Sequence, residues 1–295
     1  MIIVKLSGGL GNQLFQYSFG RYLSLKHNTE LKFDMQLNVN ASNFTPRSLG
    51  LSKYNIDLNF ATNKEIESCK FFRIGSLSRI ERKLNQSFPF LNKKYVVEKP
   101  FIILNQNLLL DDCYYEGYWQ SEFYFKSITN ILRADLKLNF DLSDQNKRIA
   151  RNMADSISVS LHIRRGDYLS VNSNAEIFSL CSLKYYQDAI NIFKNKYENP
   201  VFYIFSDDIL WAKQNFTGVN FVIVDNNQDD PHSDMYLMSQ CRHNIIANSS
   251  FSWWGAWLNS NESKVIVSPK EWFREKKMNT NAMLSLIPEN WVVIQ

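Results

Sequence analysis

The sequence predicts an α/β protein, and three features of the chain carry this prediction. Residues 2–6 form a short apolar run that leads through glycines into a segment with helical spacing of apolar residues. From residue 158 onward, short strand-like runs alternate with longer segments of helical pattern. The third feature is the run VSLHIRRGDY at 159–168, where a strand-like segment ends in cations, a glycine and an acid. Strands and helices in alternation indicate a parallel sheet covered by helices.

Length and charge limit the possible classes of protein. The chain has 295 residues, of which 45% are hydrophobic and 21% charged, so we expect a globular protein with two domains of about 150 residues each. Helical patterns at 122–136 and 143–156 precede the strand at 158, and we place the domain boundary near Asp141, with domains at 1–140 and 141–295. The net charge of +4 is too small to indicate nucleic acid as a partner. It is compatible with an anionic small ligand or with a loose hold on an acidic membrane face.

Cysteine and histidine spacing predicts reduced thiols and no metal site. The four cysteines are far apart without a CxxC pair, and the four histidines form no HxxxH pair. The opening residues MIIVKLSGG hold too short an apolar run for a signal peptide, and no window approaches 18 apolar residues. We therefore expect a cytoplasmic protein, soluble or peripheral at the inner face of the inner membrane.

The amino terminus predicts a strand, a glycine turn and a helix. The strand is expected at 2–6, the turn SGGLGNQ at 7–13 and the helix at 14–27. This order lets backbone N–H groups at a helix start approach an anion or a sugar. The turn matches neither a Walker loop nor GxGxxG, so a tight turn that simply needs glycine remains the alternative.

Residues 31–110 carry little pattern beyond a strand at 31–34, and we expect loops and short helices that are specific to the substrate. The segment 113–125 then contains seven aromatic residues in thirteen. Aromatic faces suit the C–H faces of sugars, although most such clusters are core. Gly117, Trp119 and Gln120 are the candidates for a site, because a glycine and an amide interrupt the cluster.

The strand at 158–163 is expected to have one buried face, since Val159, Leu161 and Ile163 alternate with polar residues. Arg164 and Arg165 follow at its carboxyl end, where open α/β sheets bind ligands. Two arginines supply planar forks for phosphate or carboxylate oxygens. A solvated Arg–Asp pair that caps the strand is the alternative.

The later elements bring further polar residues to the same edge. Helices are expected at 183–197, from about 208, and at 234–241, and strands at 201–205, 221–224, 244–247 and 264–267. The segments 206–208, 225–227 and 248–250 then join the two arginines at the carboxyl edge. Arginine and backbone donors there could hold a nucleotide diphosphate. No DxD pair occurs and the adjacent acid doublets diverge on an extended strand, so Arg164 is expected to replace a metal as the counter-charge to the leaving group.

Three motifs carry a resemblance to a known family. GGLGNQLFQY at 8–17, HIRRGDY at 162–168 and DMYLMSQCRHNIIANSSFSWWGAWL at 234–258 resemble bacterial α-1,2-fucosyltransferases, the glycosyltransferase family 11 enzymes. GYWQ at 117–120 and FSDD at 205–208 fall in the expected order. The resemblance implies two Rossmann-like halves facing a cleft (a GT-B type fold), an acceptor domain at 1–140 and a donor domain at 141–295. It also implies GDP-fucose as the donor, no metal requirement and inversion at the anomeric carbon.

The resemblance also implies roles for individual residues. Arg164 matches the arginine that binds the donor's β-phosphate, His162 and Asp234 match positions that contact guanine, and Ser250 matches a serine at the phosphates. Asn12 falls beside the reacting sugar. The remaining candidates are Arg165, Asp207 and Ser249 for the donor and Glu116, Trp119 and Gln120 for the acceptor.

Asp167 is expected either to orient the arginines or to accept the acceptor's proton. A carboxylate beside two arginines should have a lowered pKa, which favours the orienting role. Glu116 and Glu122 are further candidates for the base.

The expected activity is transfer of fucose to O2 of a terminal β-galactoside, in a surface-polysaccharide unit or a host-like glycan. The alternatives are a related transferase with another sugar nucleotide or acceptor, and a non-catalytic protein that binds a glycan or nucleotide. The absence of a signal peptide argues against an adhesion role for the RGD tripeptide at 165–167.

Overall fold

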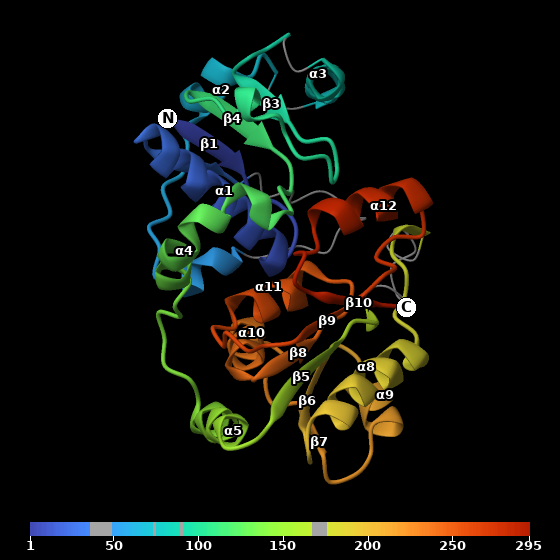
Figure 1. The fold of residues 1–295 in the computed structure, drawn as a ribbon. Helices are drawn as coiled ribbons and strands as arrows, with labels where there is room; N and C mark the ends of the chain where they lie inside the picture. Colours follow the sequence, from blue (N-terminus) through green and yellow to red (C-terminus); the bar gives the residue numbers. More distant parts are fainter. Residues whose placement is uncertain (36–48, 73–74, 89–90, 167–175) are drawn as a thin grey trace. The chain divides into compact units, whose positions relative to one another are not determined.

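The computed structural model describes residues 1–35, 49–72, 75–88, 91–166 and 176–295 (Figure 1). The chain forms two compact units. The first unit comprises Met1–Asn139 and Leu284–Leu286, and the second comprises Phe140–Met283 and Ile287–Gln295.

The first unit is built on a four-stranded parallel sheet with the strand order β2-β1-β4-β3. Its strands are β1 (Ile2–Lys5), β2 (Leu31–Asp34), β3 (Tyr95–Val97) and β4 (Cys113–Glu116). Its helices are α1 (Leu10–His27), α2 (Asn63–Cys69), α3 (Gly75–Ser87) and α4 (Thr129–Asp135), with short 3-10 turns at Gly50–Lys53, Gln106–Leu108, Glu122–Tyr124 and Lys126–Ile128.

Helix α1 begins at Leu10, four residues before the expected start at 14, so Asn12 lies in its first turn. Gly8 precedes the helix with φ of +77°, and a Cβ atom there would lie 2.4 Å from the Asn12 amide nitrogen. Only glycine fits this turn without strain. The helix ends at Asn28, which adopts the left-handed conformation of a C-cap.

The second unit is built on a six-stranded parallel sheet with the order β10-β9-β8-β5-β6-β7. Its strands are β5 (Ser158–Ile163), β6 (Val201–Ser206), β7 (Phe221–Val224), β8 (His243–Ile245), β9 (Ile266–Pro269) and β10 (Val292–Ile294). Its helices are α5 (Asp144–Ala154), α8 (Leu183–Lys196), α9 (Ile209–Asn215), α10 (Pro231–Gln240), α11 (Ser250–Leu258) and α12 (Lys276–Ser285). Read from β7 to β10, this is the strand order of a Rossmann fold.

Strand β5 differs from the expected strand with one buried face, because all six of its residues are buried. On one face, Leu161 packs with Tyr185 and Phe193 of α8. On the other face, Ser160 accepts a hydrogen bond of 2.7 Å from the side chain of Asn244. A central strand of a parallel sheet is covered by helices on both sides, so its polar alternation marks internal hydrogen bonding rather than solvent.

Two expected helices also differ in extent. The single helix expected at 122–136 is two 3-10 turns followed by the seven-residue α4. The helix expected at 234–241 begins earlier, at Pro231, after the N-cap Asp230. Among the helices of the described ranges, none combines the length and the apolar character needed to cross a membrane.

Candidate functional site

In each sheet all strands run in the same direction, so the motifs that follow the strands lie at the carboxyl edge of that sheet. The order of the strands then identifies one position along this edge. In the second unit the chain runs from β5 to β6 and β7 and then returns to β8 on the other side of β5. The strand order therefore reverses between β5 and β8. Ligands of open α/β sheets bind beside such a reversal, outside the carboxyl ends of the strands. Arg164 follows β5 and Ser249 lies shortly after β8.

Each of the two adjacent arginines is held by a different aspartate. Arg164 Nη1 lies 3.1 Å from Asp207 Oδ2, and the other oxygen of Asp207 accepts the backbone N–H of Arg165 at 2.8 Å. Arg165 Nε lies 3.3 Å from Asp208 Oδ2, and its guanidinium stacks 4.2 Å from the ring centroid of Trp211. Both arginine side chains remain partly exposed. The acid doublet thus orients the arginine doublet, one residue to each.

Asp167, the predicted orienting acid, lies outside the described residues. Asp207 was predicted as a donor-binding residue but not as the partner of Arg164. Asp208 was noted only as part of an acid doublet and not as the partner of Arg165. The adjacent doublets RR and DD at the ends of two neighbouring strands are the signal that could have identified the pairs.

Helix α11 begins at the same edge. Ser249 is its N-cap, with the side chain accepting the N–H of Phe251 at 3.3 Å, and Ser250 is its first residue. Backbone N–H groups at a helix start point outward and favour negative charge. The predicted phosphate residues therefore lie at the kind of position that binds a phosphate.

His162 on β5 is buried against Phe251, with ring centroids 5.4 Å apart. Burial and the nearby charge of Arg164 lower its pKa to about 3, so the imidazole is neutral at physiological pH. Within the described part of the chain its Nδ1 has no hydrogen-bond partner. An unpaired buried nitrogen costs about 1–3 kcal/mol, which a hydrogen bond from a ligand would remove.

Asp234 is held by a set of amides, of which Asn226 and Asn227 were expected at this edge and Asn146 was not. Asn227 donates to its Oδ1 at 2.8 Å, and Asn227 accepts from Asn146 of α5 at 2.9 Å. Asn226 donates to both of these asparagines, at 2.7 Å to Asn146 and 2.9 Å to Asn227. Burial raises the pKa of Asp234 to about 7, and the bond from Asn227 opposes this only in part.

The first unit has its own reversal, between β1 and β4. The SGGLGNQ turn follows β1 and GYWQ follows β4, so both motifs flank it. Gln16 joins them, since its amide donates to Ser7 Oγ at 3.1 Å and to the Gly117 carbonyl at 2.9 Å. Gln120 donates to Asn12 Oδ1 at 2.8 Å. Gln16 lies within the N-terminal motif but was not predicted as a site residue.

Glu98, another residue that was not predicted, binds the backbone of the GYWQ turn. Its carboxylate accepts the N–H groups of Tyr118 at 2.6 Å and Trp119 at 2.9 Å. A Cβ atom on Gly117 would lie 2.4 Å from the Glu98 Cβ. Trp119 has φ of +56°, a strained conformation for a residue with a side chain. Burial raises the pKa of Glu98 to about 7, partly opposed by the two backbone bonds.

Two predicted acceptor residues are placed differently from the expectation. Trp119 is fully buried and stacks on Phe19 with centroids 4.2 Å apart, so its ring belongs to the core and is not presented to a ligand. Glu116 is bound by Lys5 at 3.0 Å, Arg82 at 3.0 Å and Tyr95 at 2.5 Å. Burial alone would raise its pKa, but Lys5, Tyr95 and Lys70 lower it to about 2, which makes it a poor base. Glu122, the other base candidate, is paired with Lys126 at 3.5 Å.

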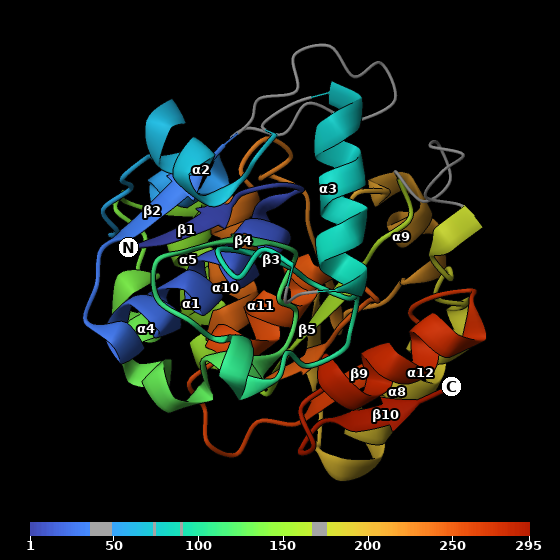
Figure 2. The same cartoon turned by 90° about the horizontal axis from the view of Figure 1, so that it is seen from above.

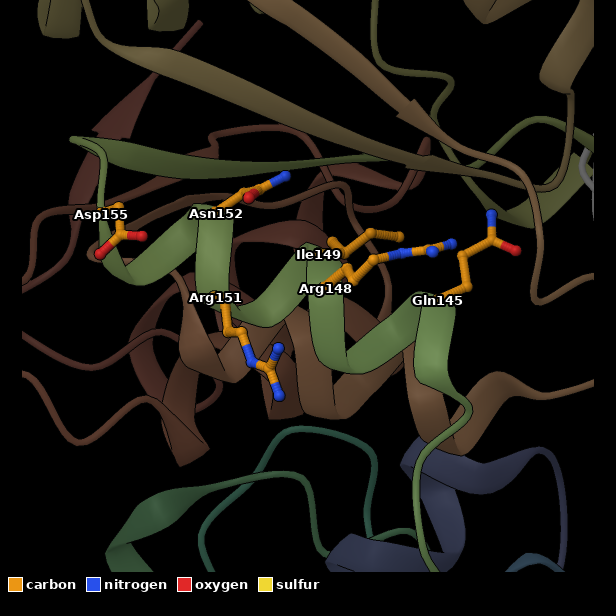
Figure 3. Close-up of a pocket in the computed structure, with 6 residues that line it drawn as sticks. All are labelled: Gln145, Arg148, Ile149, Arg151, Asn152 and Asp155. Carbon is orange, nitrogen blue, oxygen red and sulfur yellow. The ribbon is translucent and has the colours of Figure 1, made fainter.

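One surface hollow of the described residues lies elsewhere, along α5 (Figure 3). It is lined by Gln145, Arg148, Ile149, Arg151, Asn152 and Asp155. Arg148 and Asn152 extend along one side of the helix and Arg151 points to another. The hollow contains no predicted site residue, and its open shape on a single helix does not resemble a ligand site. Within the described ranges, no three His, Cys, Asp or Glu side chains gather as a metal site would require.

Comparison with known proteins places the chain in a family. It is 35% identical over 311 residues to an α-1,2-colitosyltransferase of Escherichia coli, covering 100% of this chain and 99% of that protein. It is 32% identical over 302 residues to the O-antigen biosynthesis glycosyltransferase WbnK of Escherichia coli, covering 95% and 99%. A galactoside α-(1,2)-fucosyltransferase 2 of Bos taurus is 27% identical over 144 residues, covering 45% of this chain and 42% of that protein. The model of glycosyl transferase family 11 matches residues 1–295. The chain therefore belongs to glycosyl transferase family 11.

Proposed function

We propose that this protein transfers L-fucose from GDP-β-L-fucose to O2 of a terminal β-galactoside, forming an α-1,2 linkage. The observation that carries the proposal is Arg164, held by Asp207 beside the strand reversal of a Rossmann-like sheet in a family 11 glycosyltransferase. Similarity to an α-1,2-colitosyltransferase and to a galactoside α-(1,2)-fucosyltransferase supports the linkage.

The diphosphate would lie between Arg164 and the start of α11. Arg164 offers a planar fork, and the first turn of α11 with Ser249 and Ser250 offers N–H and hydroxyl donors. Asp234 would accept from the N1–H and amino group of guanine, and the imidazole of His162, which packs against Phe251 of α11, would lie close to the same ligand. Arg164 and the donors of the first turn of α11 would stabilise the charge that develops on GDP as the sugar leaves.

In the proposed reaction the acceptor O2 attacks C1 of fucose on the face opposite GDP. The new C1–O bond forms as the bond from C1 to the phosphate oxygen breaks, GDP leaves with the electron pair, and the O2 proton passes to a base. The base must lie within about 3 Å of O2, directly or through one water. Glu116, with its pKa of about 2, does not suit this task. Asp167→Asn would separate the roles: a base variant loses transfer while keeping GDP affinity, and an orienting variant loses both.

The acceptor would bind at the loops that follow β1 and β4. Asn12 and Gln120 meet there through a 2.8 Å hydrogen bond, so a sugar hydroxyl could bind to either amide. Similarity to WbnK supports a surface-polysaccharide unit as the acceptor.

Colitose is the second candidate sugar, because the full-length relative with 35% identity is a colitosyltransferase. Colitose is L-fucose without its 3-hydroxyl group. The test is to incubate purified protein with GDP-fucose or GDP-colitose and a panel of β-galactosides, and to locate the new linkage. A site that hydrogen-bonds the 3-hydroxyl discriminates by about 10⁴-fold or more in kcat/KM, whereas an apolar pocket discriminates by about 100-fold or less. Preference for GDP-colitose, or transfer to an oxygen other than O2, would overturn the proposal.

A further inference from the structure

Helix α3 presents its apolar residues to solvent. Leu77, Ile80 and Leu84 follow the spacing i, i+3, i+7 and therefore form one stripe along the helix. Their exposed fractions are 52%, 53% and 46%. Figure 2 shows the helix along its length, beside β3. A helix that packs against a core normally buries its apolar stripe, whereas α3 exposes it.

The side of α3 that faces the protein is polar and is held by hydrogen bonds. Glu81 is buried and accepts the backbone N–H groups of Phe71 at 3.0 Å and Phe72 at 2.9 Å. Asn85 is also buried, and Gln86 donates to the Glu98 carbonyl at 2.7 Å. A rotation that buried the leucines would break these bonds, so the outward direction of the stripe is specified by the fold.

Exposed aromatic and apolar residues also flank the helix in the sequence. Phe71 and Phe72 precede α3 with 76% and 42% of their surface exposed. Phe88 and Leu91 follow it with 48% and 57% exposed. Isolated exposed apolar residues are ordinary, but seven of them among the described residues of 71–91 indicate an interaction surface.

The same segment concentrates positive charge. Residues 70–94 contain seven Lys and Arg residues and one acid, a net charge of +6 against +4 for the whole chain. Lys70 and Arg82 pair with Glu116 and Lys94 pairs with Asp112, so Arg79 and Lys83 are the cations of this segment on which the argument rests. Arg79 and Lys83 are exposed one turn apart on α3, beside Ile80. Basic residues beside an apolar stripe complement an anionic lipid surface, where phosphates lie directly above the acyl chains.

We propose that α3, with the exposed residues that flank it, docks the protein on an anionic phospholipid bilayer. The apolar stripe would enter the boundary between headgroups and acyl chains, and Arg79 and Lys83 would contact the phosphates. A helix of 13 residues is about 20 Å long and does not span the bilayer, so it lies in the interface. The proposal does not depend on the identity of the sugar or of the acceptor.

Vesicle flotation tests the proposal directly. Purified full-length protein is mixed with vesicles of phosphatidylcholine alone or of phosphatidylcholine with phosphatidylglycerol. The wild-type protein should float with the anionic vesicles, bind the neutral vesicles more weakly, and dissociate as salt is raised. Failure to bind anionic vesicles would overturn the proposal.

Two variants separate the apolar and electrostatic contributions. Leu77→Ser/Ile80→Ser/Leu84→Ser should lose binding to both kinds of vesicle. Arg79→Gln/Lys83→Gln should bind anionic vesicles about 30-fold more weakly while binding neutral vesicles as before. Matched controls are Leu25→Ser/Val219→Ser, at exposed apolar positions, and Arg148→Gln/Arg151→Gln, two cations on α5. Equal loss of binding in the controls would overturn the assignment to α3.

Transfer to a soluble galactoside, measured in the same variants, keeps this test apart from the proposed function. Both α3 variants should keep wild-type rates with soluble acceptor, because neither changes a residue of the candidate site. Light scattering tests whether a second copy of the chain covers the stripe instead. If the wild type is a dimer and the triple serine variant is a monomer that still binds vesicles, the stripe is a dimer interface and the proposal is wrong.

Discussion

Arg164 and Arg165 are neighbours in the sequence, but their side chains are held in different ways. Arg165 is fixed by Asp208 and by the face of Trp211, which suits a structural role at the edge of the sheet. Arg164 is oriented by Asp207 at 3.1 Å and lies beside the strand reversal. Of the two arginines, Arg164 is therefore the one that the proposed mechanism places at the leaving diphosphate.

Replacement of Arg164 by lysine tests this assignment. Lysine keeps the charge and loses the planar fork, so Arg164→Lys should lose about 2–4 kcal/mol of transition-state stabilisation, measured as kcat/KM. Asp207→Asn should lower the rate in the same direction because it frees the fork. Arg151→Lys, on exposed α5, is the control. Near-normal turnover in Arg164→Lys would remove this residue from the mechanism.

Asp234 should make GDP binding depend on pH. Its pKa is raised to about 7 by burial, and guanine requires the ionised form as an acceptor. GDP affinity should therefore fall by up to about tenfold for each pH unit below 7 and level off above it. Titration of the Kd by calorimetry measures this.

Asp234→Asn should bind GDP weakly and lose this pH dependence, and any slope that remains belongs to the phosphates of GDP. Asp229→Asn, at an exposed position nearby, should keep the wild-type profile. An unchanged profile in Asp234→Asn would contradict the assignment to guanine.

The positions of several candidate site residues were predictable from the sequence because these residues lie near the carboxyl ends of strands. His162, Arg164 and Ser250 lie at the carboxyl edge of the second sheet as expected. Trp119 was placed at a site and lies in the core, since a residue list does not tell which side of a turn a side chain faces. Asn146 acts on Asp234 through Asn227, which lies 81 positions further along the chain, and no local pattern predicts such a contact.

At the scale of elements, the loops that carry the motifs are rigid because hydrogen bonds join them across the strand reversal. Gln16 links the turn after β1 to the turn after β4. Glu98 then fixes the backbone of the second turn, which includes the strained Trp119. The two amides Asn12 and Gln120 are thereby held in register before any acceptor arrives.

Glu98→Gln should weaken this support, because an amide offers one acceptor oxygen where the carboxylate offers two. We expect a lower kcat with a smaller change in acceptor KM, since the variant acts on position rather than on contact. Glu67→Gln, an exposed residue of α2, is the matched control. Unchanged kinetics in Glu98→Gln would contradict a positioning role.

The same variant has a signature in stability. The pKa of Glu98 is about 7 in the folded protein and 4.5 as the ordinary value, so its contribution is fully present below pH 4.5 and is lost as pH rises through 7. The free energy of unfolding of the wild type, relative to Glu98→Gln, should fall by roughly 3 kcal/mol across this range. Urea unfolding at the two ends of the range measures the difference, and a constant difference would contradict the shifted pKa.

The elements of the second unit were largely predictable, because strands and helices alternate with clear periods from β5 to β9. In the first unit β1, α1 and β2 were predicted, but the elements between β2 and α4 were not. Strands β3 and β4 have three and four residues that are all buried, so they carry no alternation. Helix α3 has helical spacing at Leu77, Ile80 and Leu84, but polar and basic residues surround them, and the segment was predicted only as part of a region of loops and short helices. Strand β5 was predicted to have one buried face, but both of its faces are buried, and its serines lie inside the protein.

At the scale of the whole molecule, two parallel sheets each place sequence motifs beside a reversal of strand order. The two units divide between Asn139 and Phe140, whereas 284–286 belongs to the first unit. A return of the chain to the first unit could not be predicted from local pattern. Two Rossmann-like halves are the architecture that the family resemblance implied, and the sheets have it.

Transfer should not require a metal ion. In the proposed mechanism, Arg164 and the start of α11 would supply the positive charge that a metal would otherwise bring to the diphosphate. Activity should therefore survive dialysis against EDTA, assayed with GDP-fucose and a galactoside. Loss of transfer after chelation, with recovery on adding magnesium or manganese, would contradict this account of the leaving group.

The last prediction concerns how the two units divide the substrates. We expect GDP to bind through the second unit alone, since the guanine and phosphate residues follow β5, β8 and the start of α10, whereas the galactoside binds at Asn12 and Gln120 of the first unit. Gln120→Ala should then raise the acceptor KM and leave the Kd of GDP unchanged, because the lost amide, which donates to Asn12, belongs to the proposed acceptor site and not to the proposed GDP site. Arg164→Lys should show the converse, weaker GDP binding with the acceptor KM retained. Calorimetry with GDP and initial rates with varied acceptor measure the two quantities in the same preparations. If Gln120→Ala weakened GDP binding as strongly as Arg164→Lys does, the substrates would not be divided in this way.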